Sequence, residues 1–299
     1  MGKIYIGISG WRYAPWRGVF YPDDLKQDDE LAFASHSVTS IELNGSFYAL
    51  QKPESYAAWH DATPRDFVFS VKGNRFITHT KRLRDIDGPL ANVLASGVFA
   101  LGAKLGPFLW QFPPTFKYDP ARIEHFLSIL PHDTDAGLAL AQHHEARMEG
   151  KVALEVGKKR RLRHAVEVRH DSFIDASFIA LLRKYKVAMV VADTAGKWPD
   201  YEDVTADFMY LRLHGAEALY ASGYTEAALE RWADRIGTWR AGGQPDDAKL
   251  MSDKAAPKRA SRDIFCYFDN DIKVRAPFDA RRLTQMLGID TGKLNSFGP

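Results

Sequence analysis

Residues 164–169, HAVEVR, combine the pattern of a buried strand with two charges that are able to do chemistry. Val166 and Val168 alternate with Glu167 and Arg169, so the aliphatic and the charged side chains face opposite sides of an extended chain. Burying a charge costs several kcal/mol unless the charge is paired and hydrogen-bonded. The alternation therefore predicts that Glu167 and Arg169 point into a shared polar pocket.

Polar side chains also stand at or just past the ends of the other apolar runs, mostly on the phase opposite the aliphatic residues. The candidates for proton transfer are Glu167, Lys72, Glu42, His214 and Asp193. The candidates for ligand binding are Arg169, Arg212, Asn44, Gln111, Asn270, Tyr48, Tyr267, Trp11 and Tyr13. Arginine forks bind carboxylate or phosphate groups, and histidine exchanges protons near neutral pH. This mixture suits a small polar ligand that is sugar-like, anionic or phosphorylated.

Eight short apolar runs separated by helical patterns must position these residues. The runs cover residues 3–9, 37–44, 66–72, 106–112, 164–169, 187–193, 208–214 and 264–270. This alternation predicts a TIM-like (β/α)8 barrel of parallel strands, with an open doubly wound sheet as the alternative. In a barrel the polar strand ends would converge on the C-terminal mouth. The alternative is that each polar side chain pairs locally and only fills the barrel.

Two insertions interrupt the pattern within an expected single domain, residues 1–299. Residues 132–163 are predicted to form an extra helical segment before the fifth strand. Residues 242–263 contain few large apolar side chains and are predicted to form a mobile loop before the last strand.

Composition excludes several classes of protein. A net charge of +2 predicts no strong electrostatic attraction of the whole protein to nucleic acid or to a membrane. The one cysteine, Cys266, allows no disulfide within the chain and is expected in the core. We find no signal peptide and no apolar run long enough to span a membrane, so a cytoplasmic location is expected.

Several motifs together resemble a known family. They are GISGWRYAPWRGVFYP (7–22), IELNGSFY (41–48), FSVKGNRFITH (69–79), LGPFLWQFPPTF (105–116), VEVRHDSF (166–173), YLRLHG (210–215) and YFDND (267–271). Their order over nearly the whole chain resembles domain-of-unknown-function family 72, the YecE-like family. The resemblance implies a TIM-barrel-like fold and a cytoplasmic protein, and it implies no particular reaction. The chain departs from the family pattern at Val274 and Arg275 and in its two insertions.

Three functional hypotheses follow. The first is an enzyme that uses metal-independent acid–base chemistry, and the sequence requires no cofactor for it. The second is a divalent-metal enzyme of the sugar-isomerase or abasic-site-nuclease type, with Glu42, Glu167, Asp193 and His214 as ligands. Lys72, Arg169 and Arg212 argue against it, because three cations offset the carboxylates that an ion needs.

The third hypothesis is a non-catalytic module that binds nucleic acid or another ligand. Its support is KKRRLR, residues 158–163, in which five of six residues are basic. This segment precedes the fifth strand, so it is expected at the opposite end of the barrel from the pocket and in solvent. His79, which follows the third strand, is expected either to reach the rim of the pocket or to cap a helix.

Overall fold

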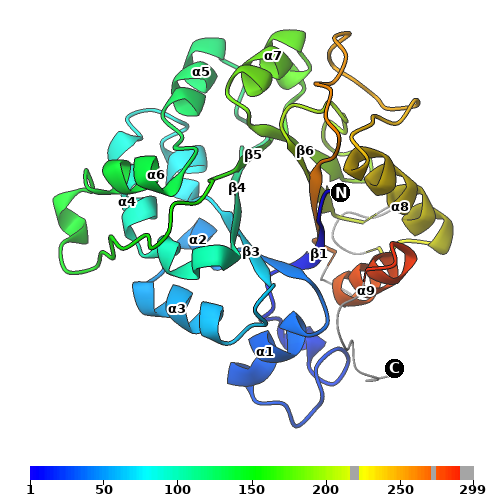
Figure 1. The fold of residues 1–299 in the computed structure, drawn as a ribbon, viewed down its shortest axis with the longest axis horizontal. Coiled ribbons are helices and arrows are strands. Elements are labelled where there is room, and N and C mark those ends of the chain that lie inside the picture. The colour runs from blue at the N-terminus through cyan, green and yellow to red at the C-terminus, as the bar shows by residue number, and fades with distance from the viewer. Residues whose placement is uncertain (216–221, 271–273, 290–299) are drawn as a thin grey trace. The chain divides into compact units, whose positions relative to one another are not determined.

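In the computed structural model the described residues are 1–215, 222–270 and 274–289. Eight parallel strands close into a barrel in chain order (Figure 1), so the barrel prediction is confirmed and the open sheet is wrong. The strands are β1 (Ile4–Ser9), β2 (Ser40–Leu43), β3 (Val68–Lys72), β4 (Leu105–Gln111), β5 (His164–Glu167), β6 (Ala188–Asp193), β7 (Phe208–Leu213) and β8 (Asp263–Phe268). Each lies within three residues of its predicted run at either end. Residue 271 of the last family motif lies outside the described residues.

Helices lie between the strands, as the alternating pattern predicts. They are α1 (Glu30–Ser35), α2 (Gly45–Tyr48), α3 (Pro53–Asp61), α4 (Asp87–Ala95), α5 (Pro120–Ser128), α6 (Thr134–Ala141), α7 (Ala176–Lys184), α8 (Glu226–Arg240) and α9 (Ala276–Met286). Side-chain caps define where several of them start. Asp119, Asp175 and Thr225 accept hydrogen bonds from the first-turn amides of α5, α7 and α8, which satisfies donors that lack partners within the helix.

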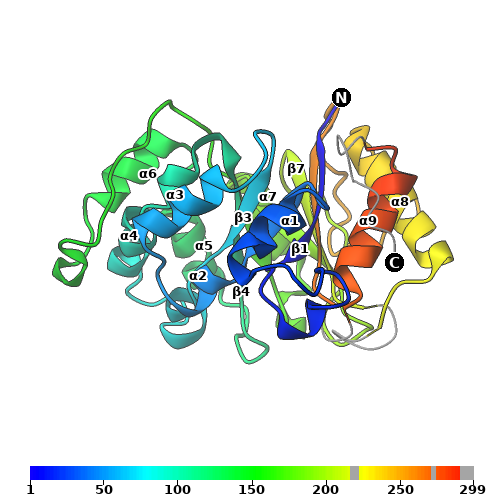
Figure 2. The ribbon, with the colours of Figure 1, turned by 90° about the horizontal axis from the view of Figure 1, so that it is seen from below.

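The chain divides into two compact units. Unit 1 comprises residues 1–42 and 174–299, and unit 2 comprises residues 43–173. In unit 1, α8 and α9 lie side by side (Figure 1, Figure 2) and bury Ile236, Trp239 and Leu283. Their apolar faces therefore cover the strands of this unit.

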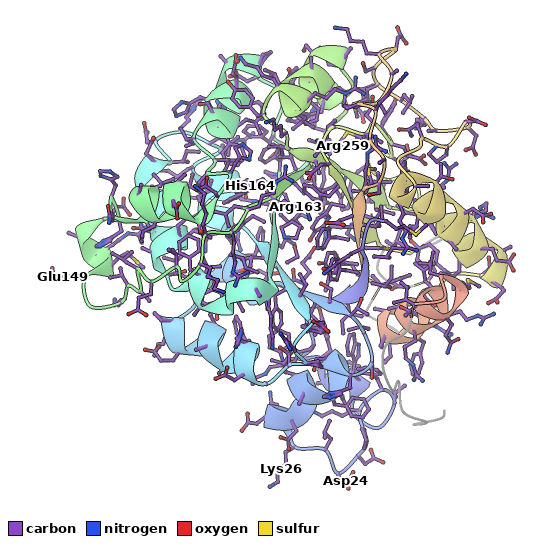
Figure 3. All side chains as sticks on the ribbon, viewed as in Figure 1. Asp24, Lys26, Glu149, Arg163, His164 and Arg259 are labelled. Atoms are coloured by element: carbon purple, nitrogen blue, oxygen red, sulfur yellow. The ribbon has the colours of Figure 1, made fainter. Side chains whose placement is uncertain are left out.

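Unit 2 has a core rich in aromatic side chains. Trp110 of β4 packs edge-on against Phe126 of α5, with ring centroids 5.4 Å apart. The imidazole of His164 bonds to the indole of Trp110 and to the carbonyl of Pro131, and burial lowers the pKa of His164 to about 3. Figure 3 shows His164 among crowded side chains, whereas Glu149 projects from the outer edge of the insertion. His164 is therefore a neutral core residue.

The first insertion is less helical than predicted. Within residues 132–163 only α6 and a short 3₁₀ turn, Ala146–Met148, are helical. Gly150 and Gly157 adopt φ angles of 73° and 59°, in the left-handed region that ends regular helix. Lys159 of the basic segment forms ion pairs with Asp133 and Asp135 on the surface.

The second insertion contains neither helix nor strand before β8 begins at Asp263, yet several of its residues are held by hydrogen bonds and ion pairs. The carboxylate of Asp203 accepts hydrogen bonds from the amides of Met251 and Ser252, at 2.6 and 3.1 Å. Lys249 pairs with Asp200 at 2.5 Å. The sequence predicts mobility from composition alone, but these contacts are those of an anchored loop.

Candidate functional site

A network centred on Arg212 occupies the strand ends of unit 1. We call Ser9, Glu42, Tyr210, Arg212, His214 and Asp269 the Arg212 cluster. Ser9 ends β1 and Glu42 lies on β2, whereas Tyr210 and Arg212 lie two residues apart on β7. Because alternate residues of a strand face the same side, Tyr210 and Arg212 both reach Glu42.

The guanidinium of Arg212 holds both carboxylates of the cluster. Its Nε and Nη2 atoms donate to the two oxygens of Glu42 at 3.1 and 2.9 Å, and Nη2 also donates to Asp269 at 2.7 Å. Tyr210 donates to Glu42 at 2.7 Å. Arg212 and Glu42 are fully buried, whereas the side chain of Asp269 is 13% exposed. The cluster therefore reaches solvent through Asp269.

His214 completes this cluster just beyond β7. Its Nδ1 atom lies 3.0 Å from Asp269 and its Nε2 atom 3.4 Å from Arg212 Nη1. The side chain is fully buried. Arg212 thus pairs with both carboxylates of the cluster, and the imidazole of His214 lies beside Asp269.

Four other candidates in unit 1 lie outside this cluster. Asp193 accepts a hydrogen bond from the phenol of Tyr224 at 3.0 Å. Asn270 donates to Asp279 at 2.8 Å and to the carbonyl of Ser222 at 2.9 Å, which ties the end of β8 to α9. Trp11 is nearly buried, and its carbonyl accepts from Tyr21. Tyr13 donates to the carbonyl of Ser9.

The remaining unit 1 candidate, Tyr267, is fully buried and its phenol bonds to Ser40 at 2.8 Å. Its ring packs 5.2 Å from that of Tyr210. These contacts fill the interior beneath the Arg212 cluster.

A second network, in unit 2, surrounds His79. We call Phe47, Lys72, Arg75, His79, Gln111, Glu167 and Arg169 the Lys72 cluster. Lys72 ends β3, and its Nζ atom stands 4.5 Å from the centroid of the Phe47 ring. The ring of His79 meets the same phenylalanine edge-on at 5.0 Å. Lys72 and His79 therefore both pack against the ring of Phe47.

Glu167 and Arg169, the pair that the strand pattern singles out, meet within this cluster. Arg169 Nε donates to Glu167 at 2.6 Å, and Gln111 donates to both carboxylate oxygens at 3.0 Å. The carboxylate is almost fully buried, whereas the Arg169 side chain is 11% exposed. Gln111 therefore fixes the orientation of Glu167.

Positive charge predominates around His79. Burial, followed by Lys72, Arg75 and Arg169, lowers the pKa of His79 to about 4, and Glu167 opposes this shift. Three cations thus act on the imidazole against one carboxylate. His79 is neutral at physiological pH, and the cluster has an excess of positive charge that an anionic ligand would balance.

Two further candidates lie at the two ends of α2, the short helix that carries Phe47. Asn44 precedes α2, and its buried Oδ1 atom accepts no hydrogen bond from the described residues. A buried acceptor of this kind is available to a ligand donor. Tyr48 is 69% exposed and packs edge-on against Phe47.

Sequence reasoning missed Asp269, Arg75 and Glu202. Asp269 follows Tyr267 by two residues and so has the same strand phase, whereas the predicted candidate was its neighbour Asn270. Arg75 is the N-cap of the π-helix Phe76–Thr80, where strand alternation gives no information. Glu202 lies between β6 and β7, and burial, aided by Asp247 and Asp200, raises its pKa to about 7 against the effect of Arg235.

The donor sets do not favour a metal ion. Among the described residues no three His, Cys, Asp or Glu side chains are grouped as a metal site requires. Of the four ligands in the metal hypothesis, Glu42 is bound by Arg212, Glu167 by Arg169 and Asp193 by Tyr224. Joint action of the Arg212 and Lys72 clusters in one pocket stays a prediction.

The fold and site define a parallel α/β barrel with charged side chains at the carboxyl ends of its strands. The chain belongs to the family described as protein of unknown function DUF72, whose model matches residues 5–298. The UPF0759 protein YecE of Escherichia coli (strain K12) is 31% identical over 137 residues, 45% of this chain and 47% of YecE. The UPF0759 protein YunF of Bacillus subtilis is 32% identical over 118 residues, 38% of this chain and 41% of YunF. The matched segments thus span less than half of either relative.

Two solved structures show the same fold. The crystal structure of a DUF72 family protein from Thermotoga maritima matches with a TM-score of 0.69 at 23% identity, covering 96% of this chain and 99% of that one. One from Enterococcus faecalis matches with a TM-score of 0.69 at 16% identity, covering 99% of both chains. No helix within the described residues has the length and apolar character needed to cross a membrane.

Proposed function

We propose that this protein is an enzyme that acts on a small, polar, anionic ligand by acid–base chemistry without a metal ion. The observation that carries the proposal is the environment of His79, whose pKa is lowered to about 4 by burial and then by Lys72, Arg75 and Arg169. A phosphate or carboxylate group would balance Lys72, Arg75 and Arg169. Sugar phosphates combine this charge with a polar body, as the sequence hypothesis expects.

The residues of the Lys72 cluster divide the work in this proposal. Lys72 and Arg169 bind the anionic group, because both are cationic side chains that retain some exposure. His79 is the proton acceptor: it is neutral in the free protein, and a bound anion would raise its low pKa toward the range in which imidazole accepts protons near neutral pH. Glu167 orients Arg169 and, through Gln111, is itself held in place.

Calorimetric titration with inorganic phosphate and with ribose 5-phosphate tests the binding step. We expect Lys72→Ala to weaken both by about tenfold, since one charge-assisted contact is lost. Lys52→Ala is the matched control, because Lys52 is an exposed lysine of the same unit. Equal affinity in the wild type and Lys72→Ala, or no binding at millimolar ligand, would contradict the proposal.

The chemical step needs a separate assay. Sugar phosphates and simple phosphate esters are screened for turnover in the presence of a chelator, and His79→Gln is compared with the wild type. We expect turnover to persist with the chelator and to be lost in the variant while phosphate still binds. Turnover that requires added Mg²⁺ or Mn²⁺ would instead favour the metal hypothesis.

A further inference from the structure

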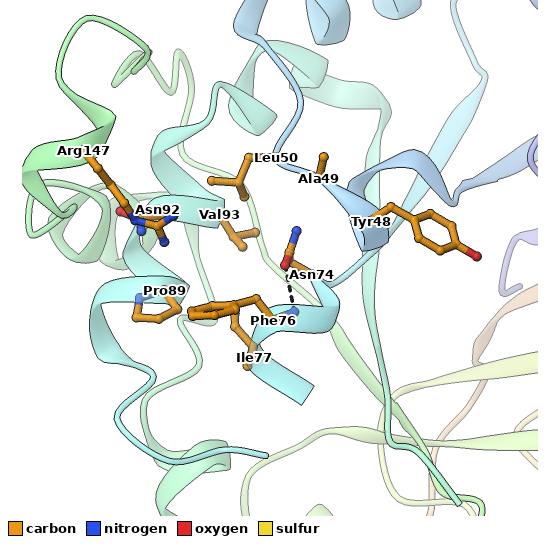
Figure 4. Close-up of a pocket in the computed structure, with 10 residues that line it drawn as sticks. All are labelled: Tyr48, Ala49, Leu50, Asn74, Phe76, Ile77, Pro89, Asn92, Val93 and Arg147. Carbon is orange, nitrogen blue, oxygen red and sulfur yellow. Dashed lines mark hydrogen bonds between the residues drawn. The ribbon is translucent and has the colours of Figure 1, made fainter. Parts of the chain in front are cut away.

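A cavity of about 220 Å³ opens in unit 2 beside the π-helix Phe76–Thr80 (Figure 4). Its walls come from the chain after α2, from α4 and from the first insertion. Leu50, Phe76, Pro89 and Val93 supply apolar surface, and Arg147 supplies a charge. None of these residues belongs to the Arg212 cluster or the Lys72 cluster.

Phe76 forms an aromatic wall of this cavity. The side chain is 39% exposed although it is large and apolar. Figure 4 shows its ring edge-on along the cavity, with Val93 and Leu50 on the opposite side and Tyr48 pointing away. Asn74 fixes this wall, since it accepts a hydrogen bond from the Phe76 amide at 2.9 Å and donates to the carbonyl of Ser46 at 3.0 Å.

Arg147 places a guanidinium at the edge of the same wall, with Cζ 5.9 Å from the centroid of the Phe76 ring. Its Nε atom donates to Glu145 at 2.8 Å. Its terminal nitrogens make no hydrogen bond to the described residues, and its side chain is 59% exposed. The fork of Arg147 therefore keeps donors that a ligand can use.

Asn92 holds this arginine in position indirectly. Its amide group bonds to the Glu145 carboxylate at 2.5 Å, and its carbonyl accepts the Glu145 amide hydrogen at 2.9 Å. These bonds tie the loop that carries Arg147 to α4. The aromatic wall and the guanidinium are thus both fixed by hydrogen bonds before any ligand arrives, which reduces the entropy lost on binding.

We propose that this cavity binds a small planar aromatic monocarboxylate. The ring stacks on Phe76 opposite Leu50 and Val93, and the carboxylate accepts hydrogen bonds from the terminal nitrogens of Arg147. The volume is below the ~300–1,000 Å³ typical of sites for drug-sized ligands, which restricts the occupant to about one ring system. Glu145 is ionised beside Arg147, so it disfavours a doubly charged phosphate more than a single carboxylate.

Titration calorimetry with benzoate tests this site, with benzamide as the uncharged probe and cyclohexanecarboxylate as the non-planar one. We expect benzoate to bind most tightly of the three. Arg147→Gln and Phe76→Leu are each expected to weaken benzoate by about tenfold. Arg122→Gln is the matched control, because Arg122 stands over the Phe116 ring at the same distance, 5.9 Å, without lining this cavity.

Titration with inorganic phosphate distinguishes binding at this cavity from binding at the Lys72 cluster. We expect Arg147→Gln to leave phosphate affinity unchanged and Lys72→Ala to leave benzoate affinity unchanged. Benzoate binding that survives both Arg147→Gln and Phe76→Leu, or that Arg122→Gln reduces equally, overturns the proposal. So does the absence of benzoate binding to the wild type. None of these results bears on phosphate binding, so the two proposals fail independently.

Discussion

The two charged clusters lie at strand ends, yet their charges are arranged differently. In the Arg212 cluster, one arginine and one histidine face two carboxylates, and nearly every group is buried. In the Lys72 cluster, three cations face one carboxylate around a neutral histidine. In the Arg212 cluster a guanidinium binds the buried carboxylate of Glu42 with two nitrogens, whereas in the Lys72 cluster three cations and one carboxylate act on a single histidine.

This difference predicts that the two clusters affect different properties, one folding stability and the other ligand affinity. A buried ion pair with saturated hydrogen bonds contributes mainly by avoiding the penalty of an uncompensated charge. A cation excess at partly exposed side chains destabilises its own cluster slightly and is relieved by a ligand. Substitutions in the Arg212 cluster should therefore change folding stability, and substitutions in the Lys72 cluster should change affinity and pH dependence.

The largest effect is expected from Arg212→Met. It leaves Glu42 and Asp269 buried without their guanidinium, so the free energy of unfolding should fall by about 3–5 kcal/mol. Urea denaturation followed by circular dichroism measures the loss. Arg12→Met is the control, because Arg12 is exposed and lies 3.8 Å from the exposed Asp28. Comparable losses of stability in Arg212→Met and Arg12→Met would contradict the stabilising role assigned to the Arg212 cluster.

The next effect concerns the pH dependence that His79 imposes. Its pKa falls from 6.5 to about 4 on folding, so the folded state disfavours the charged imidazole. Stability should therefore decrease as the pH falls through this window and level off below it, by about 2 kcal/mol for a half-buried group. Urea titrations of the wild type and His79→Gln across the window isolate this contribution by difference.

Bound phosphate is expected to change the pKa of His79. A bound anion neutralises Lys72, Arg75 and Arg169, so saturating phosphate should raise the pKa of His79 toward its ordinary value. Nuclear magnetic resonance of the imidazole protons reports this pKa directly. A pKa that stays near 4 with phosphate bound would show that the anion lies elsewhere.

A smaller loss of stability is expected from Asp269→Asn. Arg212 keeps its fork to Glu42 but loses a charged acceptor at 2.7 Å, and His214 loses its neighbour at 3.0 Å. We expect about 1–2 kcal/mol less stability. Asp28→Asn, at an exposed ion pair, is the control and should change stability little. Equal, negligible changes in both would contradict the role assigned to Asp269.

The smallest effect is expected from Glu167→Gln, which increases the cation excess without changing the size of the side chain. Phosphate should bind about threefold more tightly, because the opposing charge is removed. Glu54→Gln, an exposed position in the same unit, gives the control for a simple change in net charge. Weaker binding in Glu167→Gln would mean that the orientation of Arg169 outweighs the charge.

Alternation within strands made much of this arrangement predictable. In β5 the alternation with Val166 and Val168 predicted that Glu167 and Arg169 share one side of the strand. The same rule, applied from Tyr267 onward, would have predicted the position of Asp269. Arg75, His79 and Arg147 were harder because they follow strands or lie in an insertion, where no period relates sequence to direction. The excess of helix expected in residues 132–163 has a similar cause, since Gly150 and Gly157 end regular structure through backbone angles that composition does not reveal.

The π-helix Phe76–Thr80 carries Phe76, which lines the cavity beside Arg147, and His79, which belongs to the Lys72 cluster. Each residue of a helix turns the next by a fixed angle about the axis, so the loss of one residue here would rotate everything after it by that angle relative to everything before it. Phe76 and His79 could not then both keep their places. A deletion of one codon in this stretch would therefore disrupt either the cavity wall formed by Phe76 or the position of His79 in the Lys72 cluster. A substitution could alter either one alone.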